Sequence, residues 1–188
     1  MAAGRDVMFH NLDFFTIFVR LIVLLTALPF HEYAHAWAAR RMGDYTAEFN
    51  GRLTLNPLAH LEPVGSVLIL LTGFGWARPV PIDPGNFKNP KKGMALSALA
   101  GPLANMLMAW VLLVAYKLLV LVMAASGFRL NLGMLPMVLS IMISTNIGLA
   151  VFNLLPVPPL DGPRIFSIFL PEKYYFKIMQ YEQFIVLI

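Results

Sequence analysis

The sequence predicts an all-α polytopic membrane protein, and three observations support this fold class. Of the 188 residues, 59% are hydrophobic and only 13% are charged, whereas an ordinary soluble domain carries about 25% charged residues. The apolar residues fall in blocks long enough to cross a bilayer as helices, which takes about 20 residues each. Most charged residues lie between those blocks. We expect one domain, residues 1–188, with a three-helix core, a truncated further helix, and a small β-hairpin or re-entrant region after the first core helix.

The first predicted helix covers residues 14–42 and ends at Gly43, because glycine commonly terminates helices. Asp6 and Asp13 flank the start of this apolar run, and no small-residue cleavage site follows it. A secretory signal peptide would have a basic start and such a site. We therefore expect the run to remain in the mature protein.

Residues 43–92 differ in character from the blocks on either side. Asn50-Gly51 separates two short runs, residues 46–49 and 52–55, and this dipeptide is typical of a two-residue β-hairpin turn. Residues 64–72 are apolar but too few to cross a bilayer as a helix. This region predicts a hairpin followed by a segment that dips into the membrane or lies on its surface.

The remaining elements follow from prolines and apolar block length. The prolines in residues 76–82 exclude a central strand and allow an edge strand or a loop beside a wet cavity. Residues 94–125 and 133–155 are each long enough for a second and third crossing, and closely spaced prolines end the latter. Residues 163–188 form a terminal segment, with a short helix at its start and an apolar run that we interpret as truncated.

The distribution of lysine and arginine predicts the orientation. Only Arg129 lies between the second and third predicted crossings, whereas many basic residues lie between the first and second: Arg40, Arg41, Arg52, Arg78, Lys88, Lys91 and Lys92. Because such residues concentrate in cytoplasmic loops, we expect the 43–92 region to face the cytoplasm of a bacterial or archaeal cell. The net charge of +4 is explained by these loops, so no nucleic-acid partner is expected.

Three ionisable residues, His31, Glu32 and His35, lie within the first predicted helix. If Arg40 and Arg41 mark the interface, His31 lies roughly 14 Å and His35 roughly 8 Å inside the membrane at 1.5 Å per residue. Ionisable groups at such depth are costly and usually functional. A further basic residue, Arg20 in the same helix, is expected to extend outward to the interface.

Histidines four residues apart lie on one face of a helix, and both rings can bind one metal ion. His31 and His35 with Glu32 between them form an HExxH pattern, in which zinc lowers the pKa of a bound water and the glutamate takes its proton. The chain has no cysteine, so a metal site must use nitrogen and oxygen ligands. The alternative is a chance pattern, or two histidines that bridge helices by hydrogen bonds.

A hydrolytic zinc site usually has three protein ligands, and three residues are candidates for the third. Asp161 follows the third predicted crossing on the same side as the histidines, but Asp-Gly-Pro also matches a helix start with aspartate as N-cap. His60 and Glu62 lie between Pro57 and Pro63, which favours a loop and loop hydrogen bonding. Spacing alone leaves Asp161 open between ligand and cap.

Three motifs make the sequence similar to the site-2 protease family of intramembrane zinc metalloproteases, in a short form without a PDZ domain. These motifs are FHEYAH, GPLAN and NLLPVPPLDG, which cover residues 30–35, 101–105 and 153–162. The resemblance implies one zinc ion per chain held by His31, His35 and Asp161, with Glu32 as general base. It also implies cleavage of the transmembrane segments of other proteins. With the orientation predicted from the basic residues, the active site is expected to open toward the cytoplasm.

Asn153 is a candidate substrate-binding residue, because it precedes Asp161 by about two helical turns and an amide can bind a substrate backbone or an oxyanion. A helix-to-helix hydrogen bond is the alternative. Since a substrate helix has no free backbone groups, it must unwind before cleavage. We expect the extended substrate to pair with an edge in residues 46–55 or 76–82.

The rival function is a non-catalytic membrane protein that binds a metal ion or client helices. Glu32 beside both histidines favours an enzyme, since binding alone requires only the ligands. A metal transporter would need further acidic or histidine residues along its path. Residues 94–125 and 133–155 contain none.

Overall fold

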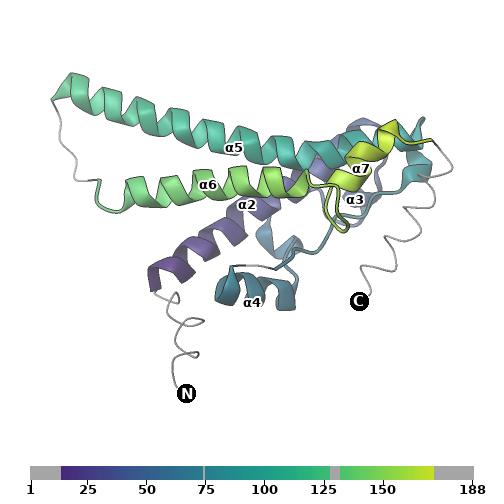
Figure 1. Cartoon of the computed structure of the whole chain (residues 1–188), viewed down its shortest axis with the longest axis horizontal. Helices are drawn as coiled ribbons and strands as arrows, with labels where there is room; N and C mark the ends of the chain where they lie inside the picture. The colour runs from purple at the N-terminus through teal and green to yellow at the C-terminus, as the bar shows by residue number, and fades with distance from the viewer. Residues whose placement is uncertain (1–13, 74, 128–131, 172–188) are drawn as a thin grey trace, which may run out of the picture.

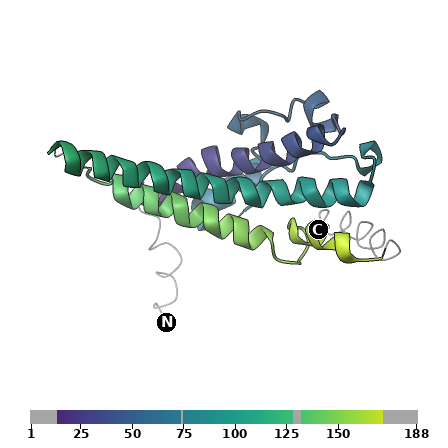
Figure 2. The same cartoon turned by 90° about the horizontal axis from the view of Figure 1, so that it is seen from above.

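A computed structural model describes residues 14–73, 75–127 and 132–171 (Figure 1). Three long helices dominate it: α2 (Phe14–Arg41), α5 (Pro90–Ser126) and α6 (Leu135–Asn153). Helix α5 lies between the other two and packs against both (Figure 2). All three are long and apolar enough to cross a membrane. The predicted all-α fold is confirmed, and the protein is a multi-pass membrane protein.

Helix α5 begins four residues before the predicted start at residue 94. Asn89 is its N-cap and accepts a hydrogen bond from the N–H of Lys92 at 3.0 Å, and Pro90 occupies the first turn. Asparagine at the cap and proline at the first helical position both favour a helix start. The 37 residues of α5 span about 55 Å at 1.5 Å per residue, more than the roughly 30 Å of a bilayer core. This helix therefore tilts strongly or extends beyond the membrane.

The predicted β-hairpin at Asn50-Gly51 is wrong. Thr46–Phe49 forms a short helix, α3, and the described residues contain no β-strand. Gly51 has a φ of +67° and its N–H bonds the carbonyl of Glu48, while the N–H of Arg52 bonds that of Ala47. These two bonds form a Schellman motif. The positive φ of Gly51 thus ends helix α3. A type I′ hairpin turn needs a positive φ at both of its central residues, but Asn50 has a φ of −87°.

Helix α4 (Pro63–Thr72) is the short apolar segment that was expected to dip into the membrane or lie on it. Its end is held by Arg20, whose Nη1 donates to the carbonyls of Leu70 and Leu71, at 2.9 Å each. The last carbonyls of a helix are unsatisfied and partly negative, so they bind a guanidinium. The expected extension of Arg20 to the membrane interface stays a prediction.

The other connections are short. The 3₁₀ helices η1 (Pro57–Ala59) and η2 (Pro84–Asn86) flank α4, and residues 76–82 are neither helix nor strand. Helix α7 (Gly162–Phe166) and η3 (Ser167–Phe169) follow α6. The sequence predicted such a short helix after the prolines. The predicted truncated helix falls largely on residues 172–188, which lie outside the described residues.

Asp44 joins the end of α2 to η2. The residue is 1% exposed. Its carboxylate accepts hydrogen bonds from the N–H of Thr46 at 3.0 Å and from the Thr46 hydroxyl at 2.5 Å. It also accepts from the Asp83 N–H and from the Asn86 side-chain amide, at 2.8 Å each. Burial by itself raises the pKa of Asp44, but these bonds to its charged form lower the pKa below its usual range. Asp44 therefore links the end of α2 to η2 as a carboxylate.

Asp44→Ala is expected to destabilise the protein, because the N–H groups of Thr46 and Asp83 would lose their acceptor. Leaving a buried donor unsatisfied costs roughly 1–3 kcal/mol of folding free energy. Since the folded-state pKa is depressed, the stabilisation is present above the unfolded pKa of about 3.9 and is lost as pH falls through the folded value. Thermal unfolding in detergent should show a gap between wild type and variant that is constant near neutral pH and narrows below about pH 4. A gap independent of pH would contradict this role.

Candidate metal centre

Helix α2 brings His31 and His35 together on its buried face. They lie one turn apart, and their Nε2 atoms are 2.9 Å from each other. Helix α5 approaches them closely at Gly101. A Cβ atom built on Gly101 would lie 2.5 Å from Cε1 and Nε2 of His35 and 2.6 Å from Cε1 of His31. Only glycine leaves room for both rings at this helix crossing.

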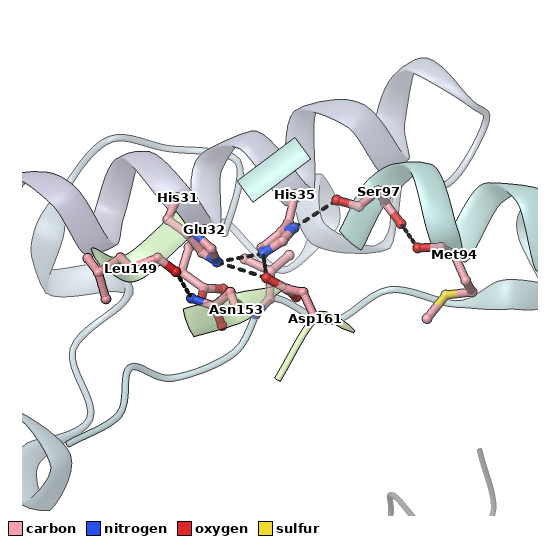
Figure 3. A network of polar contacts seen from close by, with 9 residues as sticks. His31, Glu32, His35, Met94, Ser97, Leu149, Asn153 and Asp161 are labelled. Atoms are coloured by element: carbon pink, nitrogen blue, oxygen red, sulfur yellow. Dashed lines mark hydrogen bonds and ion pairs between the residues drawn. The ribbon is translucent and has the colours of Figure 1, made fainter. Parts of the chain in front are cut away.

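The Nδ1 atom of His35 fixes how that ring presents its other nitrogen. It lies 2.7 Å from the backbone carbonyl of Ser97 in α5 (Figure 3). Because a carbonyl only accepts hydrogen bonds, Nδ1 carries the proton and the neutral ring has a lone pair on Nε2. This arrangement is the usual one for a metal-binding histidine. No sequence motif indicated Ser97, since its contact is made through the backbone.

The chain after α6 places Asp161 against the two histidines. Its Oδ2 atom lies 3.2 Å from Nε2 of His31 and 3.4 Å from Nε2 of His35. The residue occupies the N-cap position of α7, but its side chain makes no cap hydrogen bond. Gly162 permits the turn, because a Cβ there would lie 2.0 Å from the carbonyl oxygen of Leu155. Between the two alternatives left open by the sequence, this geometry supports the ligand position.

These three donor atoms fit a zinc ion. Zinc binds histidine nitrogen and carboxylate oxygen at about 2.0–2.2 Å in tetrahedral sites, so neighbouring ligand atoms lie about 3.3 Å apart. The observed separations are 2.9, 3.2 and 3.4 Å. Lone pairs at such distances repel unless a positive charge lies among them.

Glu32 completes the group, and its potential ligand atoms and those of His31 and His35 all lie within 4.8 Å of one another. Its Oε2 accepts a hydrogen bond from the backbone N–H of Val80 at 2.9 Å. Sequence reasoning missed Val80. The available signal was the alternation Pro79-Val80-Pro81, which leaves one amide donor between two prolines.

Asn153 ends α6 and lies beside Asp161 and Glu32 (Figure 3). Its Nδ2 donates to the carbonyl of Leu149, one turn earlier in α6, at 3.0 Å. The Oδ1 atom takes no part in this bond. Its substrate-binding role stays a prediction.

The two other candidates for the third ligand have partners elsewhere in the fold. Nε2 of His60 bonds the carbonyl of Thr54 at 2.8 Å. Glu62 is the N-cap of α4 and accepts from the N–H of Gly65. Both residues thus make the loop hydrogen bonds that their sequence context favoured.

Comparison with known proteins identifies a family. The model of "Peptidase family M50" matches residues 19–187. The chain is 43% identical over 167 residues to the Bacillus subtilis protein named "Putative zinc metalloprotease YwhC". This alignment covers 87% of this chain and 74% of that protein. Proteins named "Putative zinc metalloprotease Rip2" from Mycolicibacterium smegmatis and Mycobacterium tuberculosis are each 32% identical, over 80% and 85% of this chain.

These alignments cover 57% of the Mycolicibacterium protein and 60% of the Mycobacterium protein. No solved structure matches the chain. The family model covers nearly the whole sequence, and the HExxH motif, the close glycine in α5 and the aspartate after α6 all fall inside it. The chain therefore belongs to peptidase family M50, the site-2 protease family of zinc metalloproteases.

Proposed function

We propose that this protein is an intramembrane zinc metalloendopeptidase, which hydrolyses peptide bonds within or near the transmembrane segments of membrane-protein substrates. The observation that carries the proposal is the convergence of three lone pairs, from His31, His35 and Asp161, beside the carboxylate of Glu32. All four residues lie on or next to helices long enough to cross a membrane. A soluble-type protease with a single tether would place them in a water-exposed domain.

In this proposal each residue has a defined task. His31 and His35 hold zinc through Nε2, and Asp161 holds it through Oδ2. Bound zinc supplies Lewis-acid chemistry, which makes water a nucleophile at neutral pH. The Ser97 carbonyl keeps Nε2 of His35 free of a proton. Glu32 takes the proton of the attacking water and gives it to the leaving amine, as general base and then general acid.

The location proposed for the site is the cytoplasmic side of a cell membrane. The last turn of α2 carries Arg40 and Arg41, one to two helical turns beyond His35, and basic residues concentrate on that side. At this depth the site lies within the membrane, and in this proposal water reaches it from the cytoplasmic side. Substrates would be transmembrane proteins that reach it through the bilayer.

The structure limits how a substrate strand could pair with this protein. Residues 46–55 contain α3 and the loop after it, so the expectation of a strand edge there is wrong. In residues 76–82, Pro79 and Pro81 lack amide donors. A substrate strand would find mainly carbonyl acceptors on that segment, and we propose that Asn153 supplies a further polar contact to the unwound substrate.

Glu32→Gln tests the function. The variant is expected to keep zinc, because glutamine leaves all three ligands unchanged, and to lose at least about a hundredfold in cleavage rate, as removal of a general base does. Zinc content by mass spectrometry and cleavage of a single-span substrate in lipid nanodiscs should be measured for both proteins.

The rival function gives a different result. If the wild type holds zinc and cuts nothing, and Glu32→Gln changes neither property, the site serves a non-catalytic metal-binding or client-binding protein. If both proteins cleave at the same rate, Glu32 is not the general base.

A further inference from the structure

The carboxylate of Glu32 is held by a segment far away in the sequence. Residues 78–82, Arg-Pro-Val-Pro-Ile, form a strap that passes the site, and the N–H of Val80 donates to Oε2 of Glu32 at 2.9 Å. This bond uses one carboxylate oxygen. The other oxygen, Oε1, is left to handle a proton, which is what a general base requires.

The sequence of the strap enforces its shape. Proline fixes its own φ near −65°, and the residue before a proline is restricted to extended conformations. Pro79 and Pro81 therefore keep both Arg78 and Val80 extended without any neighbouring strand. Because neither proline has an N–H, Val80 supplies the single amide donor of the three central residues. A strap of this composition presents one hydrogen-bond donor at one defined place.

The strap is anchored just before Val80. The N–H of Arg78 donates to the carbonyl of His60 at 2.9 Å, and the carbonyl of Arg78 accepts from Nη2 of Arg52. The side chain of Val80 packs with Ala36, on the turn of α2 that follows Glu32, and with Ala47. Backbone and side-chain contacts therefore fix the Val80 amide relative to α2.

Arg52 is an unusual residue to find in this anchor. It is 6% exposed, and its Nε has no hydrogen-bond partner. Burial lowers the pKa of Arg52 and the nearby charge of Glu32 raises it, but a guanidinium stays protonated throughout the ordinary pH range. Burying such a charge is costly. Its contact with the Arg78 carbonyl gives it a role in holding the strap.

We infer that the strap is a positioning device for the general base, in which the Val80 N–H orients the Glu32 carboxylate and Arg52 holds the strap through the Arg78 carbonyl. This inference rests on the proposed function for its catalytic consequence. A carboxylate on a flexible side chain samples several orientations, and a fixed donor selects one before the substrate binds. Preorganisation of this kind raises kcat without changing substrate binding.

The contact itself is testable without any cleavage assay. In protein labelled with ¹⁵N-valine, the Val80 amide signal is identified by its absence in Val80→Ala. Glu32→Gln replaces a charged acceptor by a neutral one, so the Val80 amide proton is expected to shift upfield by more than that of any other valine. An unchanged Val80 signal would overturn the inference, whether or not the protein proves to be a protease.

The catalytic consequence requires a change confined to the donor. Incorporating α-hydroxyisovaleric acid at position 80 replaces the Val80 N–H by an ester oxygen and keeps the side chain. This ester variant is expected to keep the zinc content and the KM of the wild type. Its kcat should fall about ten- to hundredfold, because a hydrogen bond to a charged group is lost. Val80→Ala keeps the donor but loses part of the packing with Ala36 and Ala47, so this variant should lose less kcat than the ester variant. Equal kcat in the two variants would overturn the inference.

Arg52 provides an independent second arm. Arg52→Lys keeps a cation that can donate to the Arg78 carbonyl, whereas Arg52→Gln removes the charge. We expect Arg52→Gln to lower kcat at unchanged zinc content and KM, and Arg52→Lys to restore most of it. Equal losses of folded protein and of kcat in both variants would assign Arg52 a purely structural role. An inactive wild type would defeat the proposed function, while the valine spectrum would still decide whether Val80 holds Glu32.

Discussion

Asp161→Ala is expected to abolish zinc binding and cleavage together. The Oδ2 atom of Asp161 lies 3.2 and 3.4 Å from the two histidine Nε2 atoms, and its removal leaves two neutral ligands. Hydrolytic zinc sites generally require three protein ligands, and the lost one carries the only negative charge among the three. Metal content after dialysis against a weak chelator, measured beside the cleavage rate, checks this prediction.

The matched control for Asp161 is Glu62→Gln. Glu62 was a rival candidate for the third ligand, but its carboxylate caps α4, and a glutamine oxygen can still accept the Gly65 N–H. We expect this variant to bind zinc and cleave as the wild type does. If Asp161→Ala retained zinc while Glu62→Gln lost it, the assignment of the third ligand would be wrong.

Gly101→Ala is the second change with a large expected effect, although glycine carries no chemistry of its own. The new methyl carbon would lie 2.5 Å from Nε2 of His35, the atom that faces the proposed zinc ion, and 2.6 Å from Cε1 of His31. Separations below 3.0 Å require something to move. His35 cannot turn aside without losing its bond to the Ser97 carbonyl. We therefore expect a folded protein with strongly reduced zinc content and cleavage.

Gly148→Ala is the control for this change, because it makes the same substitution within another crossing helix. A Cβ at Gly148 meets no atom within 4 Å, so neither zinc content nor cleavage should change. Zinc titration of both variants, with circular dichroism to confirm helix content, separates the two cases. Wild-type zinc affinity in Gly101→Ala would show that the histidines do not lie against α5 as described.

The sequence was sufficient for the features that depend on local pattern. Helix length follows from apolar block length, and the three crossing helices end within two residues of the predicted positions. The pairing of His31 with His35 follows from helical periodicity alone. For Asp161, spacing left two alternatives of equal standing, and only the similarity to a family favoured the ligand role. The turn at Gly162 that brings Asp161 back to the histidines is a tertiary feature.

The features that sequence reasoning missed depend on partners distant in the chain. Asn50-Gly51 predicts a hairpin turn because a positive φ at glycine serves both hairpins and helix ends, and the bonds from Gly51 and Arg52 back to α3 decide between the two. The bonds from Arg20 to the carbonyls of α4 join residues about 50 positions apart, and no local pattern reveals them. The hydrogen bond from the Val80 N–H to Glu32 joins residues 48 positions apart, so no local pattern reveals it either.

The most direct test of an intramembrane metalloprotease is the position of the cut. A single-span substrate should be incubated in lipid nanodiscs with zinc-loaded wild type and with Glu32→Gln, and the products should be identified by intact-mass spectrometry. The proposed function requires cleavage by the wild type at a peptide bond within or near the apolar segment, and an intact substrate with the variant. Cleavage only in the water-exposed flanks, or identical products with the variant, would contradict it.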